Sequence, residues 1–455
     1  MGKNKVRGIG ILLSTFLLSN CAYAGDWDHV KQACKNAKDA LTRATVEDCA
    51  IKFYGVTPLG PQVGSIAPQG NLGLGLRVTG TIMHPPSKGA KPDTKSSESD
   101  FLVRGLYSFS NFYLMEGQYD FKLPALGQGV ATTSTFEDRI DIRVFASRLN
   151  LNKQRFYGLG ENSVPTALTA YRQLQNQIGG SADWPLTSWL ETGGTAQWVT
   201  PTILGVSGTT VPSVGTIYGN SGAPGIVSQP AFMNYKAYVD VHTGSNTTQT
   251  WQRTKLRATY EHFTDLESKA YTFDRMSGFA SISFDLRRNL SSLTLPWWKS
   301  MLCEPMQTQC SMGQLIFNGL ATASYVGSAS SVPFYFQPTL GGTDINGVDT
   351  LRGLLDFRLR APNRILLQAQ LDHHLWSFFG ISGFYDLGKV AANPGGLGLS
   401  HLRHDFGIGA FFKIQNKVVV RAYVGFGGGE GIHPNFKVPR AMWGSWETMP
   451  MATYP

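Results

Sequence analysis

Long apolar runs are scarce in this sequence. Mean hydropathy is −0.12, and after residue 24 no run approaches the roughly 18 apolar residues of a membrane-spanning helix. The run Ile9–Leu18 is too short to cross a bilayer, and it lies between three basic residues and the small-residue site Ala22-Tyr23-Ala24. This pattern predicts a secretory signal peptide over residues 1–24. Lipid attachment at Cys21 fits less well, because an asparagine stands directly before it.

Cysteine is also scarce. Only four cysteines follow residue 24, namely Cys34, Cys49, Cys303 and Cys310. In an exported chain an even number of cysteines predicts disulfides, and the spacing predicts the pairs Cys34–Cys49 and Cys303–Cys310. Neither pair has C-x-x-C spacing or zinc-type companions, so we expect structural bonds rather than redox or metal chemistry.

Charged residues make up only 16% of the chain and form no dense block of one sign. The formal net charge is +9, and removing the three cations of the signal peptide leaves +6. Nucleic-acid binding normally requires a concentrated basic patch. We therefore expect no nucleic-acid partner.

Signals for catalysis, metals and cofactors are missing as well. The nine histidines are scattered, and no Ser/His/acid set has a recognisable motif. The neighbours His373 and His374 point to opposite faces of a strand, which makes them a poor chelating pair. The glycine-rich segment 425–431 has no Lys-Ser/Thr after it, so it predicts a turn rather than a phosphate-binding loop. We expect no enzyme activity, no metal and no cofactor.

What the sequence does contain is a repeated alternation of apolar and polar residues. It is clearest over residues 72–82, 113–123, 139–147, 275–287 and 406–426. Such alternation over about ten residues at a time is typical of a transmembrane β-barrel, and recurring tryptophans suit its interfacial belts. A large soluble β-sandwich or propeller is the alternative; charges of both signs on the polar face and runs of unusual length favour the barrel.

The predicted fold is therefore all-β: a transmembrane antiparallel barrel of about 16 strands, surrounded by the lipids of a bacterial outer membrane. We divide the chain into the signal peptide 1–24, a short N-terminal periplasmic segment or plug 25–69, the barrel 70–438 and a C-terminal tail 439–455. Residues 415–416 predict a two-residue turn, whereas 83–100, 124–134, 203–226 and 327–353 predict long connections. We expect short turns on the periplasmic side and long loops outside.

Four motifs occur in an order that resembles a known family. They are RFYGLGENS at 155–163 with Tyr171 after it, VPFYFQPTLGG at 332–342, DTLRGL at 349–354 and GFYDLGKV at 383–390. Together they resemble the barrel of the bacterial surface antigen family, the superfamily of BamA- and TamA-like outer-membrane assembly factors and two-partner-secretion transporters. The resemblance covers about residues 60–438.

This resemblance implies a loop that folds back into the barrel interior, marked by Gly341, Gly342 and Leu351. Its tip residues Arg352 and Gly353 would be held there by Asp386 on the inner wall. We call these three residues the loop lock. The alternation supports the same assignment separately, because Ile381 and Tyr385 on the outer face would turn Asp386 inward. Residues 354–361 would then form the returning limb of the loop, with Asp356, Arg358 and Arg360 lining the interior.

The resemblance also implies a function in translocating or inserting protein, or lipid, at the outer membrane. Residues 25–69 are too few for the periplasmic POTRA domains of BamA-like proteins, so a separate periplasmic partner protein is expected to supply the receptor function. The implied seam between first and last strands would involve the glycine-rich strand with Gly73 and Gly75, because glycine weakens strand pairing. The alternative is a porin-like channel or structural barrel without insertase activity.

Overall fold

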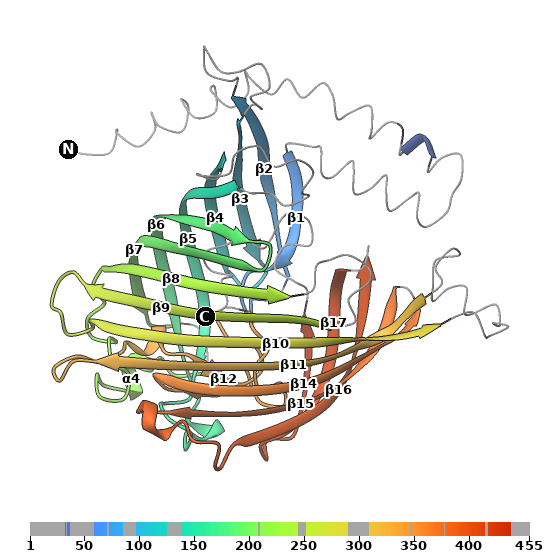
Figure 1. Ribbon diagram of the computed structural model, residues 1–455. Helices are drawn as coiled ribbons and strands as arrows, with labels where there is room; N and C mark the ends of the chain where they lie inside the picture. Colours follow the sequence, from blue (N-terminus) through green and yellow to red (C-terminus); the bar gives the residue numbers. More distant parts are fainter. Residues whose placement is uncertain are drawn as a thin grey trace.

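Most of the chain folds into one curved antiparallel sheet of 16 strands (Figure 1). The computed structural model describes residues 32, 34–36, 59–70, 72–84, 97–124, 139–207, 210–243, 252–289, 309–345, 347–376, 378–414 and 417–437. The strands of the sheet are β1 (Leu59–Ser65), β2 (Leu72–His84), β3 (Ser97–Ser108), β4 (Tyr113–Pro124), β5 (Arg139–Phe156), β6 (Thr169–Thr187), β7 (Leu190–Leu204), β8 (Phe232–Thr243), β9 (Gln252–Asp265), β10 (Phe273–Asn289), β11 (Gln309–Val326), β14 (Asn363–Trp376), β15 (Phe379–Ala391), β16 (Arg403–Ile414), β17 (Lys417–Gly427) and β18 (Ile432–Lys437). The prediction of an all-β antiparallel fold of about 16 strands is confirmed.

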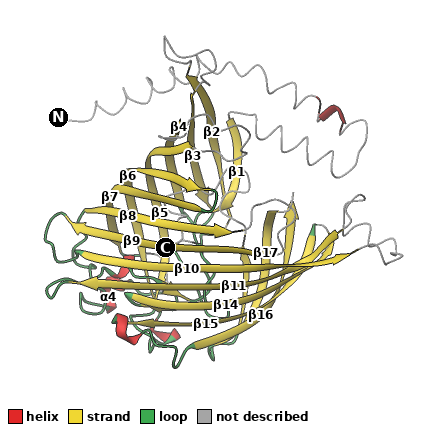
Figure 2. Ribbon diagram, viewed as in Figure 1, coloured by secondary structure: helices red, strands yellow, loops and turns green. Residues whose placement is uncertain are grey.

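Helices are short (Figure 2). Residues 34–36, ahead of β1, are helical. Those in the connections between strands are η1 (Pro165–Ala167), α4 (Val214–Ile217), η3 (Phe334–Phe336) and η4 (Pro394–Gly396). In the part of the chain that the structure describes, no helix is long and apolar enough to cross a bilayer. Two further strands, β12 (Thr339–Leu340) and β13 (Leu359–Arg360), form a separate two-stranded sheet.

The faces of the sheet are inverted relative to a soluble protein. On β15 the outward residues Ile381 and Tyr385 are both 45% exposed, whereas the inward Ser382, Phe384 and Asp386 are buried. On β2 the leucines at 72, 74 and 76 are exposed and Arg77 is buried. Large apolar side chains therefore cover the outer face while charged side chains are enclosed, as expected of a sheet surrounded by lipid.

The first strand begins earlier than predicted. Residues 59–65, assigned to the segment ahead of the barrel, form β1 and pair with β2 from Leu59 opposite Val78 to Ser65 opposite Leu72. Pro61 is tolerated there because β1 lies at the edge of the sheet, where a residue without an N–H group breaks no ladder. The boundary at residue 70 was therefore wrong, and Gly73 and Gly75 lie in the second strand, not in the edge strand predicted at the seam.

The prediction that the long connections lie at one end of the sheet is wrong, because they occur at both ends. Because neighbouring strands run antiparallel, the connections after β2 and β4 lie at the end opposite to those after β7 and β11. Residues 83–84 and 97–100 belong to β2 and β3 themselves. We call the end that carries the β7–β8 and β11–β14 connections the loop end.

Several predictions fall partly or wholly outside the described residues. These include the signal peptide, the turn at 415–416 and the tail 439–455. Cys34 is in a disulfide bond, but Cys49 and Cys303 lie outside the described residues, as does the side chain of Cys310. The two cysteine pairings stay predictions.

Candidate functional site

Residues 327–362, between β11 and β14, form a long loop whose central part lies inside the curved sheet; we call it the inserted loop. Leucine side chains hold it against the wall. Residues Leu340, Leu351, Leu354 and Leu359 of the loop share one buried cluster with Leu320, Leu366 and Val390 of β11, β14 and β15. Burying a leucine contributes about 1.5–3 kcal/mol. The loop is therefore packed as a core element rather than a mobile surface segment.

The two glycines of the T-L-G-G motif form the base of the inserted hairpin. Gly341 and Gly342 have φ angles of +120° and +55°. A Cβ atom would lie 2.3 Å from the carbonyl oxygen of Leu355 at Gly341 and 2.1 Å from Asp356 Oδ1 at Gly342. The Gly342 N–H donates to the Leu351 carbonyl at 2.8 Å, which closes the hairpin. Only glycine fits both the conformation and the space.

Arg352 and Asp386, predicted to face each other, are in direct contact. Arg352 Nε donates to Asp386 Oδ2 at 2.8 Å and Nη2 donates to Oδ1 at 2.7 Å, while the side chains are only 4% and 0% exposed. The guanidinium also stacks on Phe384, 3.8 Å from the ring centroid. Such a two-point, charge-assisted pair is strong and directional.

A second carboxylate, which sequence reasoning missed, binds the tip of the loop. Asp405 on β16 stands opposite Asp386 in the strand register, and its Oδ2 accepts the backbone N–H of Gly353 at 2.9 Å. A Cβ at Gly353 would lie 2.6 Å from Asp405 Cβ, and one at Gly425 would lie 2.5 Å from the Arg352 carbonyl oxygen. The tip therefore rests on bare backbone of β17, which explains why glycine follows the arginine.

Two more arginines connect the returning limb to the segment 155–171. Arg358 Nη1 donates to Ser163 Oγ at 2.7 Å, and Gly160 N–H donates to the Arg360 carbonyl at 2.7 Å. Arg360 Nη2 reaches Tyr171 Oη at 3.3 Å. The motif at 155–163 is thus bound to the returning limb of the inserted loop, far away in the sequence. As predicted, residues 354–361 are not a strand of the 16-stranded sheet. Arg358 and Arg360 are both buried.

Aromatic rings fill the interior near the loop end. Phe334 packs against Phe156 and Tyr171, with ring centroids 5.2 and 5.0 Å apart, and Phe336 packs against Phe232 at 5.2 Å. The Arg360 guanidinium donates to the Phe334 carbonyl at 2.6 Å among these rings. The V-P-F-Y-F segment therefore serves to pack this end of the interior.

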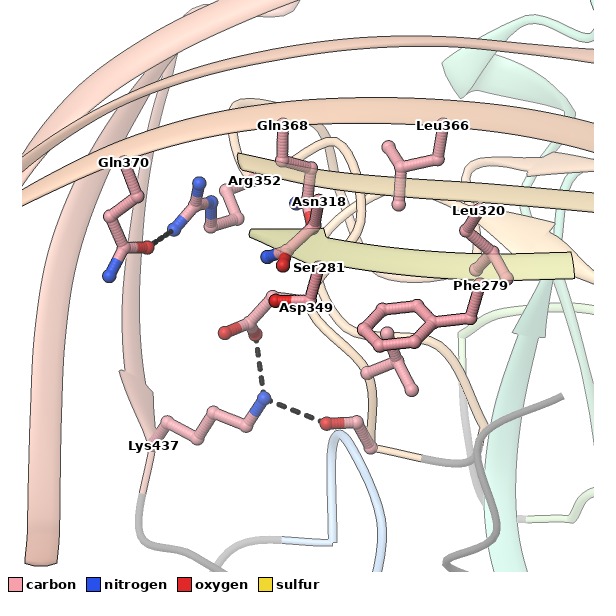
Figure 3. A pocket seen from close by; sticks show the side chains of 12 residues that line it. Phe279, Ser281, Asn318, Leu320, Asp349, Arg352, Leu366, Gln368, Gln370 and Lys437 are labelled. Atoms are coloured by element: carbon pink, nitrogen blue, oxygen red, sulfur yellow. Dashed lines mark hydrogen bonds and ion pairs between the residues drawn. The ribbon is translucent and has the colours of Figure 1, made fainter. Parts of the chain in front are cut away.

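A cavity of about 230 Å³ remains beside the loop tip (Figure 3). The wall contributes Ser281, Asn318 and Gln368 from three adjacent strands, the loop contributes Asp349 and Arg352, and β18 contributes Lys437. Arg352 Nη1 donates to Gln370 across this cavity, and Lys437 donates to Asp349. Burial alone would raise the pKa of Asp349, but Lys437 and Arg352 lower it below its ordinary value. Within the described ranges, no three His, Cys, Asp or Glu side chains form a group that could hold a metal.

Comparisons with solved structures find similar chains at low sequence identity. BamA from Haemophilus ducreyi, lacking POTRA domains 1–3, aligns with 84% of this chain and 68% of its own, at 10% identity and a TM-score of 0.49. CdiB from Acinetobacter baumannii aligns with 84% of this chain and 59% of its own, at 9% identity and a TM-score of 0.44. CdiB from Escherichia coli aligns with 85% and 63%, at 12% identity and a TM-score of 0.44.

No family model matches the chain, and no curated protein matches it in sequence. For both CdiB structures this chain spans less than two thirds of their length. BamA is among the proteins that the motifs resemble, but all three TM-scores lie below 0.5, so they establish neither a family nor an activity for this chain.

Proposed function

We propose that this chain is an integral β-barrel of the bacterial outer membrane, of the surface antigen type, that translocates or inserts polypeptide, or lipid, at that membrane. The observation that carries the proposal is the inserted loop, held inside the wall by the Arg352–Asp386 pair. The apolar outer face supports the membrane location, because charged pairs fill the enclosed face instead.

The filled interior favours this function over that of a porin-like channel. A diffusion channel depends on a water-filled lumen, but here the described interior holds the buried Arg352, Arg358 and Arg360 together with the rings around Phe334. The described interior is thus occupied by a bound loop, and in the proposed function this loop is the element that moves. In the proposed role, Arg352, Gly353 and Asp386 act as a lock that sets the position of this element.

In the proposed function, the sheet opens between its two edge strands. β1 has seven residues and β18 has six, against 19 in β6. In the part of the chain that the structure describes, β1 and β18 are the two edge strands, and each pairs with one neighbour only. Unpaired edge strands are templates for pairing with another chain. We further propose that a separate periplasmic protein delivers the substrate.

A crosslinking experiment tests this function. Cysteines introduced in β1 and in β18 are joined by a bifunctional reagent, and the purified barrel is assayed in vesicles for polypeptide insertion and for ion conductance. We expect joining the edges to abolish insertion, and reversal of the crosslink to restore it. Insertion that proceeds unchanged with the edges joined, or a barrel that only conducts ions, would refute the proposal in favour of the porin-like or structural alternative.

A further inference from the structure

The inserted loop contacts the last hairpin of the sheet at two separate places. At the turn between β17 and β18, Arg358 forms an ion pair with Glu430, and the two side chains are 2% and 6% exposed. At the far end of β18, Lys437 Nζ donates to Asp349 Oδ1 and to the Gly347 carbonyl, both at 2.7 Å (Figure 3).

The two contacts are well separated along the chain. Glu430 and Lys437 are about 20 Å apart at the rise of an extended strand. On the loop side, Asp349 and Arg358 belong to one hydrogen-bonded unit built on residues 341–343. Thr343 pairs with Asp349, and Phe357, next to Arg358, donates its N–H to the Gly341 carbonyl at 3.1 Å. The same short segment of the loop therefore reaches both ends of β18.

Among the described residues, β18 has one neighbouring strand, β17. β18 pairs with β17 over six positions, from Ile432 opposite Phe426 to Lys437 opposite Arg421, and Pro434 has no N–H group to donate. Its outward side chains Ile432 and Phe436 are 66% and 67% exposed. The ion pairs with the loop are thus a large part of what fixes β18 on its inner side.

We propose that the inserted loop clamps the last strand at both ends, through Arg358–Glu430 and Asp349–Lys437, so that β18 is released only when the loop is displaced. This inference rests on the proposed function, in which the sheet opens at its edges. It assigns Glu430 and Lys437 as positioning residues that act through the loop. Displacing Arg352 from Asp386 would move Asp349 and Arg358 with it, which couples the lock to the edge of the sheet.

Backbone amide hydrogen exchange of residues 432–437, measured on the full chain in lipid nanodiscs, tests the clamp. We expect roughly threefold faster exchange for Lys437→Gln, because its pair with Asp349 is partly exposed, at 27% and 23% of the two side chains. For Glu430→Gln we expect more than tenfold, because that pair is buried. Arg352→Gln, which removes neither ion pair, should also accelerate exchange in β18. Lys437→Arg, which keeps a cationic donor opposite Asp349 and the Gly347 carbonyl, should retain the slow rate.

Matched controls come from β3 and β4, which hold ion pairs of the same kinds. Lys122→Gln removes a pair with Asp100 that is 2.9 Å long and about as exposed, and Glu116→Gln removes a buried pair with Arg104. Both should leave β18 unchanged. If Lys437→Gln and Arg352→Gln leave β18 exchange at the wild-type rate, the clamp is refuted. Because Lys437 is partly exposed, its substitution leaves the chain folded, and the test stands even if Glu430→Gln misfolds.

The exchange experiment contains no substrate, so it decides the clamp independently of the activity. Polypeptide insertion by the same variants, measured in vesicles, decides the proposed function. Faster β18 exchange with unaltered insertion would support the clamp and count against opening at the edges, so the two failures are distinguishable.

Discussion

Replacing Gly425 by alanine tests whether the inserted loop must rest on bare backbone. An added Cβ would lie 2.5 Å from the Arg352 carbonyl oxygen and 2.7 Å from Gly353 Cα. Non-bonded carbon atoms settle about 3.5–4.0 Å apart, so the loop tip would have to withdraw by about 1 Å. Both obstructing atoms are backbone atoms, so no side-chain rotation can relieve the clash.

The size of the effect follows from what that displacement disturbs. A shift of about 1 Å lengthens the 2.7 and 2.8 Å bonds between Arg352 and Asp386 beyond hydrogen-bonding range. Breaking a buried ion pair costs about 3–5 kcal/mol, whereas absorbing one extra methyl group by strain costs about 1–3 kcal/mol. Because the loop and β17 can share the displacement, the ion pair is kept and the cost is that of strain, so we expect Gly425→Ala to lower the free energy of unfolding by about 1–3 kcal/mol.

Two measurements check this expectation: denaturant unfolding in lipid and limited proteolysis within residues 338–361. Gly383→Ala is the matched control, because Gly383 lies in β15, two strands away in the same sheet, and an added Cβ there meets no atom within 4 Å. If Gly425→Ala unfolds at the same denaturant concentration as Gly383→Ala and is cleaved no faster, the reasoning about the loop seat is refuted.

The remaining predictions concern the loop's charged groups. Arg352→Ala should leave export of the chain intact while increasing protease sensitivity of the loop and ion conductance; unchanged values of both would contradict the loop lock. Arg360→Ala should lower the thermal unfolding midpoint, with a loss of about 2–4 kcal/mol, because it removes a buried guanidinium that bonds a carbonyl among aromatic rings. The lowered pKa of Asp349 means that its contribution is complete above the unfolded-state pKa of about 4 and is lost as pH falls through the lower folded value. The stability difference between wild type and Asp349→Asn should therefore stay constant from about pH 5 to 8 and shrink below about pH 4, and a difference that fell between pH 7 and 5 would contradict this assignment.

The wall of this protein could be predicted from sequence because alternation is a local property. A period of two over ten or more residues needs no knowledge of the rest of the fold, and it also assigned Asp386 to the inner face. β1 was not predicted as a strand, because Pro61 and the glycines around it obscure the alternation in a strand of seven residues. Pro61 is acceptable only because β1 is an edge strand, and the residues around Pro61 do not indicate that position in the sheet.

The partners of the loop were harder to predict than the loop itself. The arginine between leucine and glycine stands out in the sequence, and a paired motif pointed to Asp386. Asp405 gave no such signal, because an aspartate on the inner face of an alternating strand looks like any other charged wall residue. Glu430 and Lys437 depend on how deep the loop reaches into the interior, a distance that only the assembled molecule sets.

The contact between the segment 155–171 and the returning limb of the loop also constrains the order of folding. Consecutive strands of the sheet are joined by connections no longer than residues 327–362, whereas Ser163 and Arg358 are separated by 195 positions and Arg403 and Glu161 by 242. Closing loops of that length is slow, because their entropy is lost before any contact rewards it. Hairpins therefore form first, and the arginines of the loop find their partners only after strands from both halves of the chain have come together. A chain that stopped short of β16 would contain Asp386 and the leucine cluster but would lack Asp405, Glu430 and Lys437, the partners that hold the loop from the other side.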